Sequence, residues 1–404
     1  YKYDTNSRSD RYNFRATTDV NLAKSLVFSM SIGAIFQDKT YPGTSSADIF
    51  AQMRQNSPIS MPKTNPDGTP GSGASAVILN PWALTTQSGY SKQFITTIQS
   101  TANINWDLSS LVTKGLSVAA KFSYDMYYAN YVSRHVSYGM KRYMGQDEYG
   151  NDTYNLIREQ GSMEYAVTNT ANRAYYWDVS VNYNRAFGEH NIAAMMLFNR
   201  RDYKDLTASS SMYNLPYRRQ GLAGRVTYDY GHRYMAEFNF GYNGSENFRP
   251  GKRYGFFPSL SLGWSVTNEP YIPQAVKDVM SFKLRGSYGI AGNDQIGGDR
   301  FLYISTVNYG NGAYFGSTQQ YLSGIYEGKV GADVTWEKAY KLDIGFDMKF
   351  FKDALSIQVD YFNEDRRDIL LSRGTIPIVT GITAATYANL GQVKNRGVDA
   401  MIEW

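Results

Sequence analysis

The sequence predicts an all-β protein, namely a transmembrane antiparallel β-barrel. Three observations predict this fold class. A membrane-spanning helix needs about 20 consecutive apolar residues, and the longest apolar run here is the short stretch Ile192–Phe198. Many segments alternate apolar and polar residues with a period of two, as barrel strands do. The connections between those segments are alternately short and long, as in outer-membrane barrels.

The composition excludes several other classes of protein. Tyr, Phe and Trp together make up 15% of the residues, there are 36 Gly and no Cys, and the mean hydropathy is −0.45. The absence of Cys argues against a disulfide framework and against thiolate metal sites. The net charge of +5 is small for 404 residues, and the basic residues are scattered, so no nucleic-acid footprint is indicated.

Alternating segments that read as strands follow one another along the whole chain. In Lys341–Phe350, the clearest case, Leu342, Ile344 and Phe346 share one side while Asp343 and Asp347 share the other. The other segments named on this criterion are Tyr12–Leu22, Ile98–Trp106, Leu116–Tyr124, Trp177–Tyr183, Tyr234–Tyr242, Leu260–Val266, Leu355–Tyr361 and Arg396–Trp404.

Lipid contact decides which side of each strand faces where. A lipid-facing Lys near the bilayer midplane costs roughly 2–4 kcal/mol, so the charged side must face the interior or water. The residues predicted to line the interior on this ground are Lys121, Asp178, Glu237, Asp343 and Asp347. A soluble sandwich would show the same alternation, but it would not require alternating loop lengths.

About thirteen strands are predicted from the breaks in the alternation. Short connections are expected at Ala23–Ser25, Leu108–Lys114, Phe187–His190, Tyr230–Arg233 and Phe351–Ala354. Long polar connections are expected at Asp38–Lys92, Tyr127–Asn172, Tyr203–Gln220, Gly244–Tyr254, Gly292–Asp333 and Asn363–Val393. Asn268–Met280 is intermediate in length, and we expect it to hold a helical turn on the short side.

The strand count also bears on the extent of the domain. A bacterial barrel of this kind has an even number of strands, and the chain starts at Tyr1 without Met and without a signal peptide. We therefore expect residues 1–404 to be the central part of one barrel domain, with a plug domain and further carboxyl-terminal strands outside this chain.

Several blocks in the second half of the chain resemble the SusC/RagA family of TonB-dependent outer-membrane transporters from Bacteroidetes. The match is densest over Gly221–Trp404, where the blocks follow the family order and spacing. They are Gly221–Tyr230, Arg253–Trp264, Phe282–Asp294, Trp336–Gly345 and Asn389–Gly397.

The resemblance implies a 22-stranded, plugged barrel in the outer membrane of a Gram-negative bacterium. It implies active import of a glycan or oligopeptide, energised by the TonB complex, together with a SusD-like surface lipoprotein as a lid. No cofactor is implied, and an assembly of two transporter–lid pairs stays open. The alternatives are a passive porin-type channel, a surface adhesin and, with the least support, an outer-membrane enzyme.

Residues that suggest catalysis or metal binding have simpler interpretations. His135, His190 and His232 lack the converging partners of a metal site. The group Glu364–Arg367 follows a strand and reads as a solvated charge cluster rather than an acid–base pair. Gly241, Gly244 and Gly251 lie in a predicted loop without the following helix that a phosphate site needs. We therefore predict no catalytic, cofactor or metal residues.

Aromatic residues in the two longest predicted connections are the candidate substrate contacts. Stacking against sugar rings or packing against peptides is possible for Trp82, Tyr138, Tyr143 and Tyr149. For Trp82 and Tyr143, loop packing and ligand contact are equally good interpretations. Tyr127 and Tyr128 fit better in the aromatic girdle that such barrels carry at the membrane surface.

Overall fold

The computed structural model describes residues 7–57, 59–297, 300–310, 312–351, 353–374, 377, 379 and 386–404. Thirteen strands in these ranges form one antiparallel sheet. Each strand pairs with the strand of the sheet that follows it along the chain, and the small strands β5, β6 and β13 to β16 lie outside this sheet. This confirms the predicted fold class and strand number. The strands are β1 (Arg8–Ala23), β2 (Leu26–Pro42), β3 (Gly89–Asp107), β4 (Leu116–His135), β7 (Glu164–Phe187), β8 (His190–Asp205), β9 (Tyr217–Tyr230), β10 (Tyr234–Ser245), β11 (Tyr254–Ser265), β12 (Met280–Asn293), β17 (Glu337–Phe350), β18 (Leu355–Ser372) and β19 (Tyr387–Glu403).

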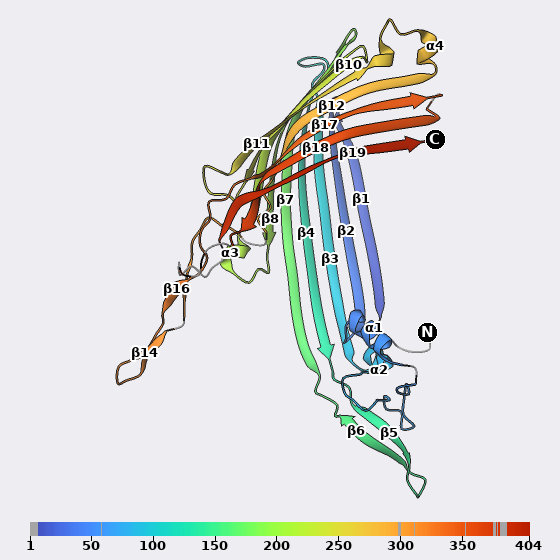
Figure 1. Ribbon diagram of the computed structural model, residues 1–404, viewed down its shortest axis with the longest axis vertical. Helices are drawn as coiled ribbons and strands as arrows, with labels where there is room; N and C mark the ends of the chain where they lie inside the picture. Colours follow the sequence, from blue (N-terminus) through green and yellow to red (C-terminus); the bar gives the residue numbers. More distant parts are fainter. Residues whose placement is uncertain are drawn as a thin grey trace.

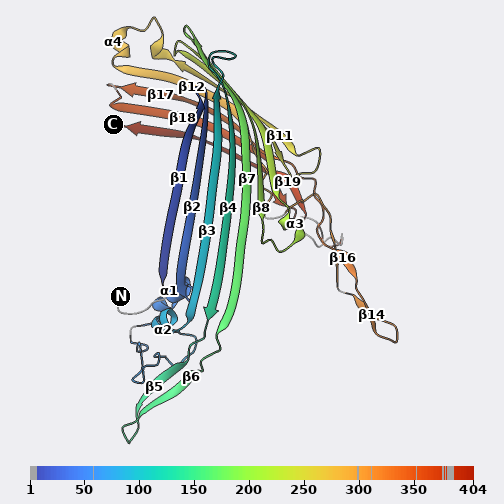
Figure 2. The ribbon, with the colours of Figure 1, turned by 180° about the vertical axis from the view of Figure 1, so that it is seen from behind.

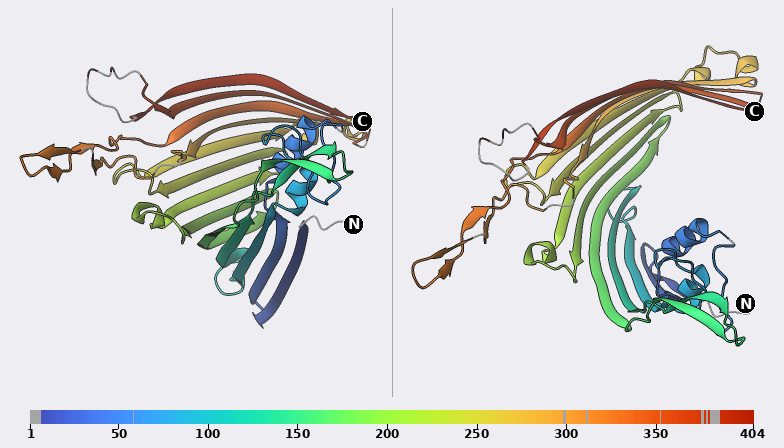
Figure 3. Two further views of the ribbon diagram at one scale, coloured as in Figure 1. Left: turned by 90° about the horizontal axis from the view of Figure 1, so that it is seen from below. Right: turned by 60° about the horizontal axis from the view of Figure 1, so that its bottom comes forward.

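The sheet is a single curved layer. Figures 1 and 2 show β1 to β7 running along the long axis of the molecule, while β17 to β19 cross it obliquely. Figure 3 shows that the strands follow an arc. Strands tilt and twist in this way when a sheet wraps towards a barrel.

The connections at the two ends of the sheet differ as predicted. One end carries the connections 24–25, 108–115, 188–189, 231–233, 266–279 and 351–354, and the other carries 43–88, 136–163, 206–216, 246–253, 294–336 and 373–386. Gly188 in the turn 188–189 has φ +62°, a value that glycine adopts at little cost in tight hairpin turns. We call the end of the sheet with the first set of connections the short-loop end and the opposite end the long-loop end.

The helical turn expected near 268–280 is present. A 3₁₀ helix, η1 (Val266–Asn268), and the short helix α4 (Gln274–Lys277) follow β11. The Trp264 indole N–H donates a hydrogen bond of 2.8 Å to Glu269 Oε1 and so fixes the start of this connection.

Small elements give structure to the long loops. The connection 43–88 contains α1 (Ser46–Gln55) and α2 (Pro81–Thr86), and the side chains of Ser45 and Asn80 cap their amino ends. These side chains accept hydrogen bonds from backbone N–H groups that would otherwise be unpaired at the start of a helix. The remaining elements are β5 (Met140–Gln146), β6 (Asp152–Arg158), α3 (Ser211–Asn214), β13 (Val307–Tyr309), β14 (Ala313–Phe315), β15 (Gln320–Leu322) and β16 (Ile325–Glu327).

Several strands extend beyond their predicted bounds at the long-loop end. Tyr127 and Tyr128 are paired residues of β4, opposite Thr97 and Thr96 of β3, and do not begin a loop. Glu364–Arg367 lies within β18, so its placement at the start of a loop was wrong. Gly241 and Gly244 likewise belong to β10.

Buried cores lie in the loops, because both faces of the open sheet are exposed. One core joins Phe248 of the connection 246–253, Phe257 of β11, and Leu302, Val334 and Trp336 of the connection 294–336. The Phe257 ring covers two glycines: a Cβ built at Gly255 or Gly292 would lie 2.3 or 2.1 Å from it. A second core joins Ala83, Leu84, Tyr138 and Met140. None of the helices in the described ranges is long and apolar enough to cross a membrane.

Candidate functional site: the polar face of the sheet

The strand register places the five predicted interior residues on one face. Residues directly opposite each other in an antiparallel pair project to the same side. Lys121 lies opposite Asp178, and Asp178 lies opposite Asn199. From Asn199 the row continues through Gly221 to Asn243 of β10.

One further row, together with the spacing along β10 and β17, connects the remaining residues. Glu237 is six positions before Asn243 in β10, so it shares that face. Glu237 lies opposite Ser261, Ser261 opposite Ser287, and Ser287 opposite Asp343. Asp347 follows Asp343 by four positions in β17 and also shares the face. We call this side of the sheet the polar face and the other side the apolar face.

The apolar face exposes large hydrophobic side chains in register. Val226, Phe238, Leu260 and Tyr288 lie opposite one another in turn on four strands. They are 47%, 43%, 48% and 53% exposed. A continuous apolar surface of this kind marks contact with a membrane or a partner rather than with water.

Arg285 is the centre of a charge network on the polar face. Its guanidinium contacts three carboxylates, Asp360 at 2.6 Å, Asp347 at 3.2 Å and Asp343 at 3.4 Å. The planar guanidinium has five N–H donors and can serve several acceptors at once. The network therefore ties β12 to both β17 and β18.

Gly345 makes the contact between Arg285 and Asp360 possible, which crosses the intervening strand β17. It lies between Arg285 and Asp360 in the register, opposite Arg285 on one side and opposite Asp360 on the other. A Cβ at Gly345 would lie 1.9 Å from Asp360 Oδ1. The absence of a side chain on β17 leaves the space in which Arg285 reaches over the strand.

A second ion pair lies on the same face nearer the middle of the sheet. Arg225 Nη2 is 2.7 Å from Glu237 Oε2, and the Asn239 side chain donates to Glu237 Oε1, also at 2.7 Å. All of these groups come from β9 and β10. Together with the Arg285 network they give the polar face fixed charges of both signs.

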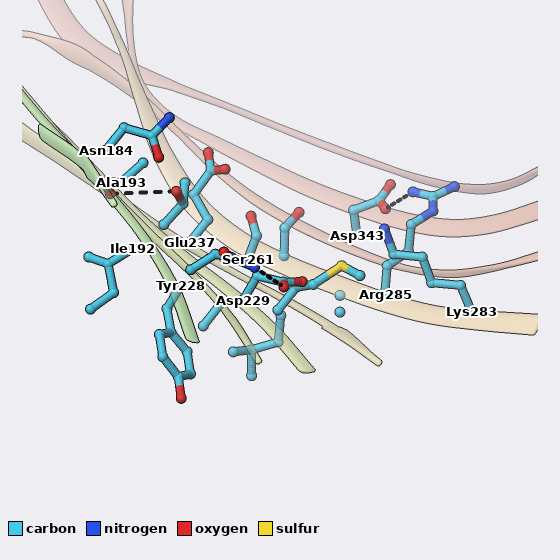
Figure 4. A pocket seen from close by; sticks show the side chains of 18 residues that line it. Asn184, Ile192, Ala193, Tyr228, Asp229, Glu237, Ser261, Lys283, Arg285 and Asp343 are labelled. Carbon is cyan, nitrogen blue, oxygen red and sulfur yellow. Dashed lines mark hydrogen bonds and ion pairs between the residues drawn. The ribbon is translucent and has the colours of Figure 1, made fainter. Parts of the chain in front are cut away.

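The polar face is hollowed between these networks. A hollow of about 620 Å³ extends over β7 to β17, and its polar lining includes Asp229, Glu237, Ser261, Arg285 and Asp343. Figure 4 shows Glu237 and Asp343 on one side of the strands and Tyr228 on the other. This arrangement suits the wall of a water-filled interior, which contacts solutes through charges and hydroxyl groups.

Sequence reasoning missed Arg285, Asp360 and Arg225. The alternation Phe282, Lys283, Leu284, Arg285 would have identified Arg285, because the charged residues lie on the side away from the leucine and phenylalanine. The contact with Asp360 spans two strand spacings, about 10 Å, and depends on Gly345. No pattern within a single segment indicates it.

Two of the candidate loop aromatics, Trp82 of the connection 43–88 and Tyr138 of the connection 136–163, pack in one loop core. Tyr138 is 3% exposed, its hydroxyl accepts the Asn80 backbone N–H at 2.9 Å, and the Arg158 guanidinium lies over its ring. Burial raises the pKa of the Tyr138 phenol. Trp82 is the second residue of α2 and packs against the same core, with Lys63 Nζ 5.0 Å from its ring. The Tyr138 ring does not face solvent.

The other two aromatics lie on the hairpin of β5 and β6. Tyr143 donates a hydrogen bond of 3.1 Å to Asp152 and contacts Tyr154 with ring centroids 5.6 Å apart. Tyr149, in the turn of this hairpin, is 81% exposed. The four candidates therefore form two separate groups in adjoining long loops, at a distance from the charge networks of the polar face.

The charged and metal-ligating residues weighed in the sequence have local partners. Within β18, Glu364 pairs with Arg366 at 2.8 Å and Asp365 with Arg367 at 2.6 Å. In the part of the chain that the structure describes, no group of three or more His, Asp or Glu residues is arranged to hold a metal ion.

Comparison with known proteins supplies the family context. Residues 34–404 match the family described as TonB dependent receptor-like, beta-barrel. The TonB-dependent receptor SusC of Bacteroides thetaiotaomicron is 32% identical over 182 residues, which are 44% of this chain and 18% of SusC. The TonB-dependent receptor P3 of Formosa agariphila is 25% identical over 268 residues, 60% of this chain and 26% of P3.

A solved structure shares the fold. The RagAB peptide importer in its closed-closed state superposes with a TM-score of 0.71 at 16% identity, covering 98% of this chain and 44% of that one. The chain thus spans less than half of the length of each of these three relatives.

Proposed function

This chain belongs to the TonB-dependent receptor β-barrel family, and from that premise we propose that it forms the barrel wall of an active nutrient importer. Receptors of this family are transporters of the Gram-negative outer membrane and not enzymes. The cargo in this proposal is a glycan or an oligopeptide. The observation that carries this proposal is the family match over residues 34–404. These residues form most of a sheet that has one charged face and one exposed apolar face.

The two faces have separate roles in the proposed mechanism. The apolar face contacts lipid, and the polar face lines a water-filled interior through Lys121, Asp178, Glu237, Asp343 and Asp347. Hydroxyl groups and fixed charges on that wall replace part of the water lost by a passing solute, which lowers the cost of moving a polar molecule through the membrane. No covalent step is needed.

The complete barrel in this proposal contains more strands than the thirteen described. In the described sheet β1 and β19 each pair on one side only, and an unpaired strand edge cannot face lipid. We propose that further strands complete a plugged barrel of about 22 strands, and that the TonB complex pulls on the plug to open the path.

A lid lipoprotein of the SusD type is the proposed partner at the long-loop end. The support is the likeness to SusC and to RagAB, which is a peptide importer. Trp82, Tyr143 and Tyr149 are the proposed substrate or lid contacts among the loop aromatics. Tyr138, as a buried packing residue, would act only by shaping the loop.

An uptake assay on cells carrying the full-length protein tests the proposal. Labelled oligosaccharide and oligopeptide pools are offered to wild-type cells, to a deletion strain and to cells without a functional TonB complex. We expect uptake from one pool to fall to the deletion level when TonB or the proton gradient is removed. Uptake that needs neither would instead identify a passive channel, and surface binding without any uptake would identify an adhesin.

A further inference from the structure

A small hollow rich in arginine lies on the polar face at the long-loop end of β8, β9 and β10. It has a volume of about 220 Å³, and its lining includes Arg201, Tyr203, Tyr217, Arg219, Ser245 and Arg300. We call it the arginine hollow. It is separate from the larger hollow around Arg285, whose lining shares none of these residues.

The strand register brings two positive charges together in this hollow. Arg201 of β8 lies directly opposite Arg219 of β9, and Arg219 lies opposite Ser245 of β10. Like charges directly opposite each other are unfavourable in a sheet. The next pair towards the loops is Tyr203 and Tyr217, whose ring centroids are 5.8 Å apart.

The carboxylates around the hollow compensate only some of its arginines. Arg219 Nη2 lies 2.9 Å from Asp294, a carboxylate with 11% of its side chain exposed. Arg218, at the rim, pairs with Asp202 at 2.9 Å and with Glu246 at 3.8 Å. Glu246 also lines the hollow, but Arg218 already holds it.

The two remaining arginines have no carboxylate partner among the described residues. Arg300 is 2% exposed and donates to the carbonyl oxygens of Met212 and Pro216, while its guanidinium covers the Tyr217 ring at 3.8 Å. Arg201 is exposed, and its side chain makes no hydrogen bond or ion pair with the described residues, while its backbone pairs within the sheet. Among the described residues none occupies the N–H donors of the Arg201 guanidinium, which are therefore available to a ligand.

We propose that the arginine hollow binds a carboxylate group of the imported cargo. The proposal rests on the import function proposed above and narrows its substrate class to acidic molecules. The guanidinium of Arg201 matches the two oxygens of such a group in a bidentate pair, and Arg219 adds positive charge beside it. Pockets for whole drug-sized ligands measure about 300–1,000 Å³, so this hollow takes one group of a longer chain.

The location of the hollow fits capture of cargo at the entrance. It lies at the long-loop end of the polar face, where a molecule arrives before it passes the wall below. Arg201 and Arg219 face water, so the attraction is screened by salt over a Debye length of about 8 Å at physiological ionic strength. Binding there should be selective for charge and readily reversible.

Binding measurements on the purified full-length transporter test the inference. The probes are oligogalacturonate and a triglutamate peptide, with galacto-oligosaccharide and triglutamine as their neutral counterparts. We expect at least one acidic probe to bind about tenfold more tightly than its neutral counterpart. Arg201→Gln should remove most of that preference, and raising the salt concentration should weaken acidic binding in the unmutated protein.

A matched control separates the hollow from charge in general. Arg54 is an exposed arginine of α1 in another long loop, and Arg54→Gln changes the net charge by the same amount. We expect it to leave the preference for acidic probes intact. The two acidic probes distinguish a uronate-containing glycan from an acidic peptide as the source of the group.

The inference and the import proposal can fail separately. Equal binding of acidic and neutral probes, or an acidic preference that survives Arg201→Gln, overturns the anion site. TonB-dependent uptake of a neutral cargo, unchanged by Arg201→Gln, would do the same and leave the importer standing. Arg201-dependent binding of an acidic probe in a protein that imports nothing would support the site and reject the importer.

Discussion

Arg285 on β12 and Asp360 on β18 form a 2.6 Å ion pair across the intervening strand β17. The residue of β17 that lies between them is Gly345. A single glycine thus permits a contact between next-nearest strands, in addition to the backbone hydrogen bonds that join each strand to its neighbour. The pair couples three strands through side chains on the polar face.

Gly345→Ala should destabilise the barrel by about 1–3 kcal/mol, because the added methyl group overlaps Asp360 and forces that side chain away from Arg285. Urea unfolding of the full-length protein in detergent measures the change. Gly286→Ala is the control: a Cβ there meets its nearest neighbour at 3.8 Å. Equal stability of the two variants would contradict the role assigned to Gly345.

Arg285→Gln should be more damaging than Asp360→Asn. Removing Arg285 leaves Asp343, Asp347 and Asp360 facing one another without their shared cation, whereas removing the Asp360 charge leaves Arg285 with two partners. These groups are partly exposed, so solvent screening limits the difference to about 1–2 kcal/mol. Unfolding midpoints of the two variants in the same detergent give the order, and the reverse order would show that the network does not depend on the arginine.

Arg300→Gln should loosen the connection 206–216. The buried guanidinium holds the carbonyl groups of Met212 and Pro216, and hydrogen bonds from a charged donor contribute roughly 1.5–3 kcal/mol each. We expect limited proteolysis within 206–216 to accelerate about tenfold or more, while the strands stay protected. Arg249→Gln, which removes an exposed loop arginine paired with Asp333, should leave cleavage in 206–216 unchanged.

The contact between the loops 246–253 and 294–336 should weaken only in acid. Lys252 donates a 2.7 Å hydrogen bond to Asp333, and together with Arg249 it lowers the pKa of the Asp333 carboxyl below its ordinary value of 3.8. For a lowered pKa, the stabilisation is fully present above the unfolded-state value and is lost as the pH falls through the folded-state value. The window therefore lies below about pH 4.

The fluorescence of Trp336 reports this change, since its indole donates to the Arg253 carbonyl in the buried core beside these loops. The emission difference between the protein and its Trp336→Phe variant should be constant from pH 8 to pH 5 and should change below pH 4. Asp333→Asn should remove that acid step. A step near neutral pH, or one that persists in Asp333→Asn, would assign it to another group.

The sequence predicted the strands accurately in the zone that faces lipid and less accurately beyond that zone. Lys341–Phe350 alternates because one side of β17 must be apolar, and its predicted bounds are close to the observed Glu337–Phe350. Beyond that zone both sides of a strand meet water, and the period of two disappears. The sequence pattern therefore predicts a loop from Tyr127 onwards, whereas β4 continues to His135 and pairs continuously with β3 and β7.

For the candidate site, the sequence predicted which face each residue lies on but not which residues of other strands it contacts. The face on which Lys121 or Asp343 lies follows from local alternation, and the register agrees with it across the sheet. The partner of Arg285 at Asp360 and the clustering of Arg201 with Arg219 depend on which strands are neighbours and in what register. The burial of Tyr138 depends on a loop core assembled from 43–88 and 136–163, which no local pattern reveals.

Spin labels on adjacent residues of β11 test the central claim most directly, because Leu260 lies on the apolar face and Ser261 on the polar face. These 404 residues contain no Cys, so Leu260→Cys and Ser261→Cys can each be labelled without background from this part of the protein. In bilayers, the label at 260 should collide mainly with oxygen dissolved in lipid, and the label at 261 mainly with a water-soluble nickel complex. Equal access of the nickel complex to both positions, or the reverse preference, would contradict a sheet whose apolar face touches lipid and whose polar face lines a water-filled interior.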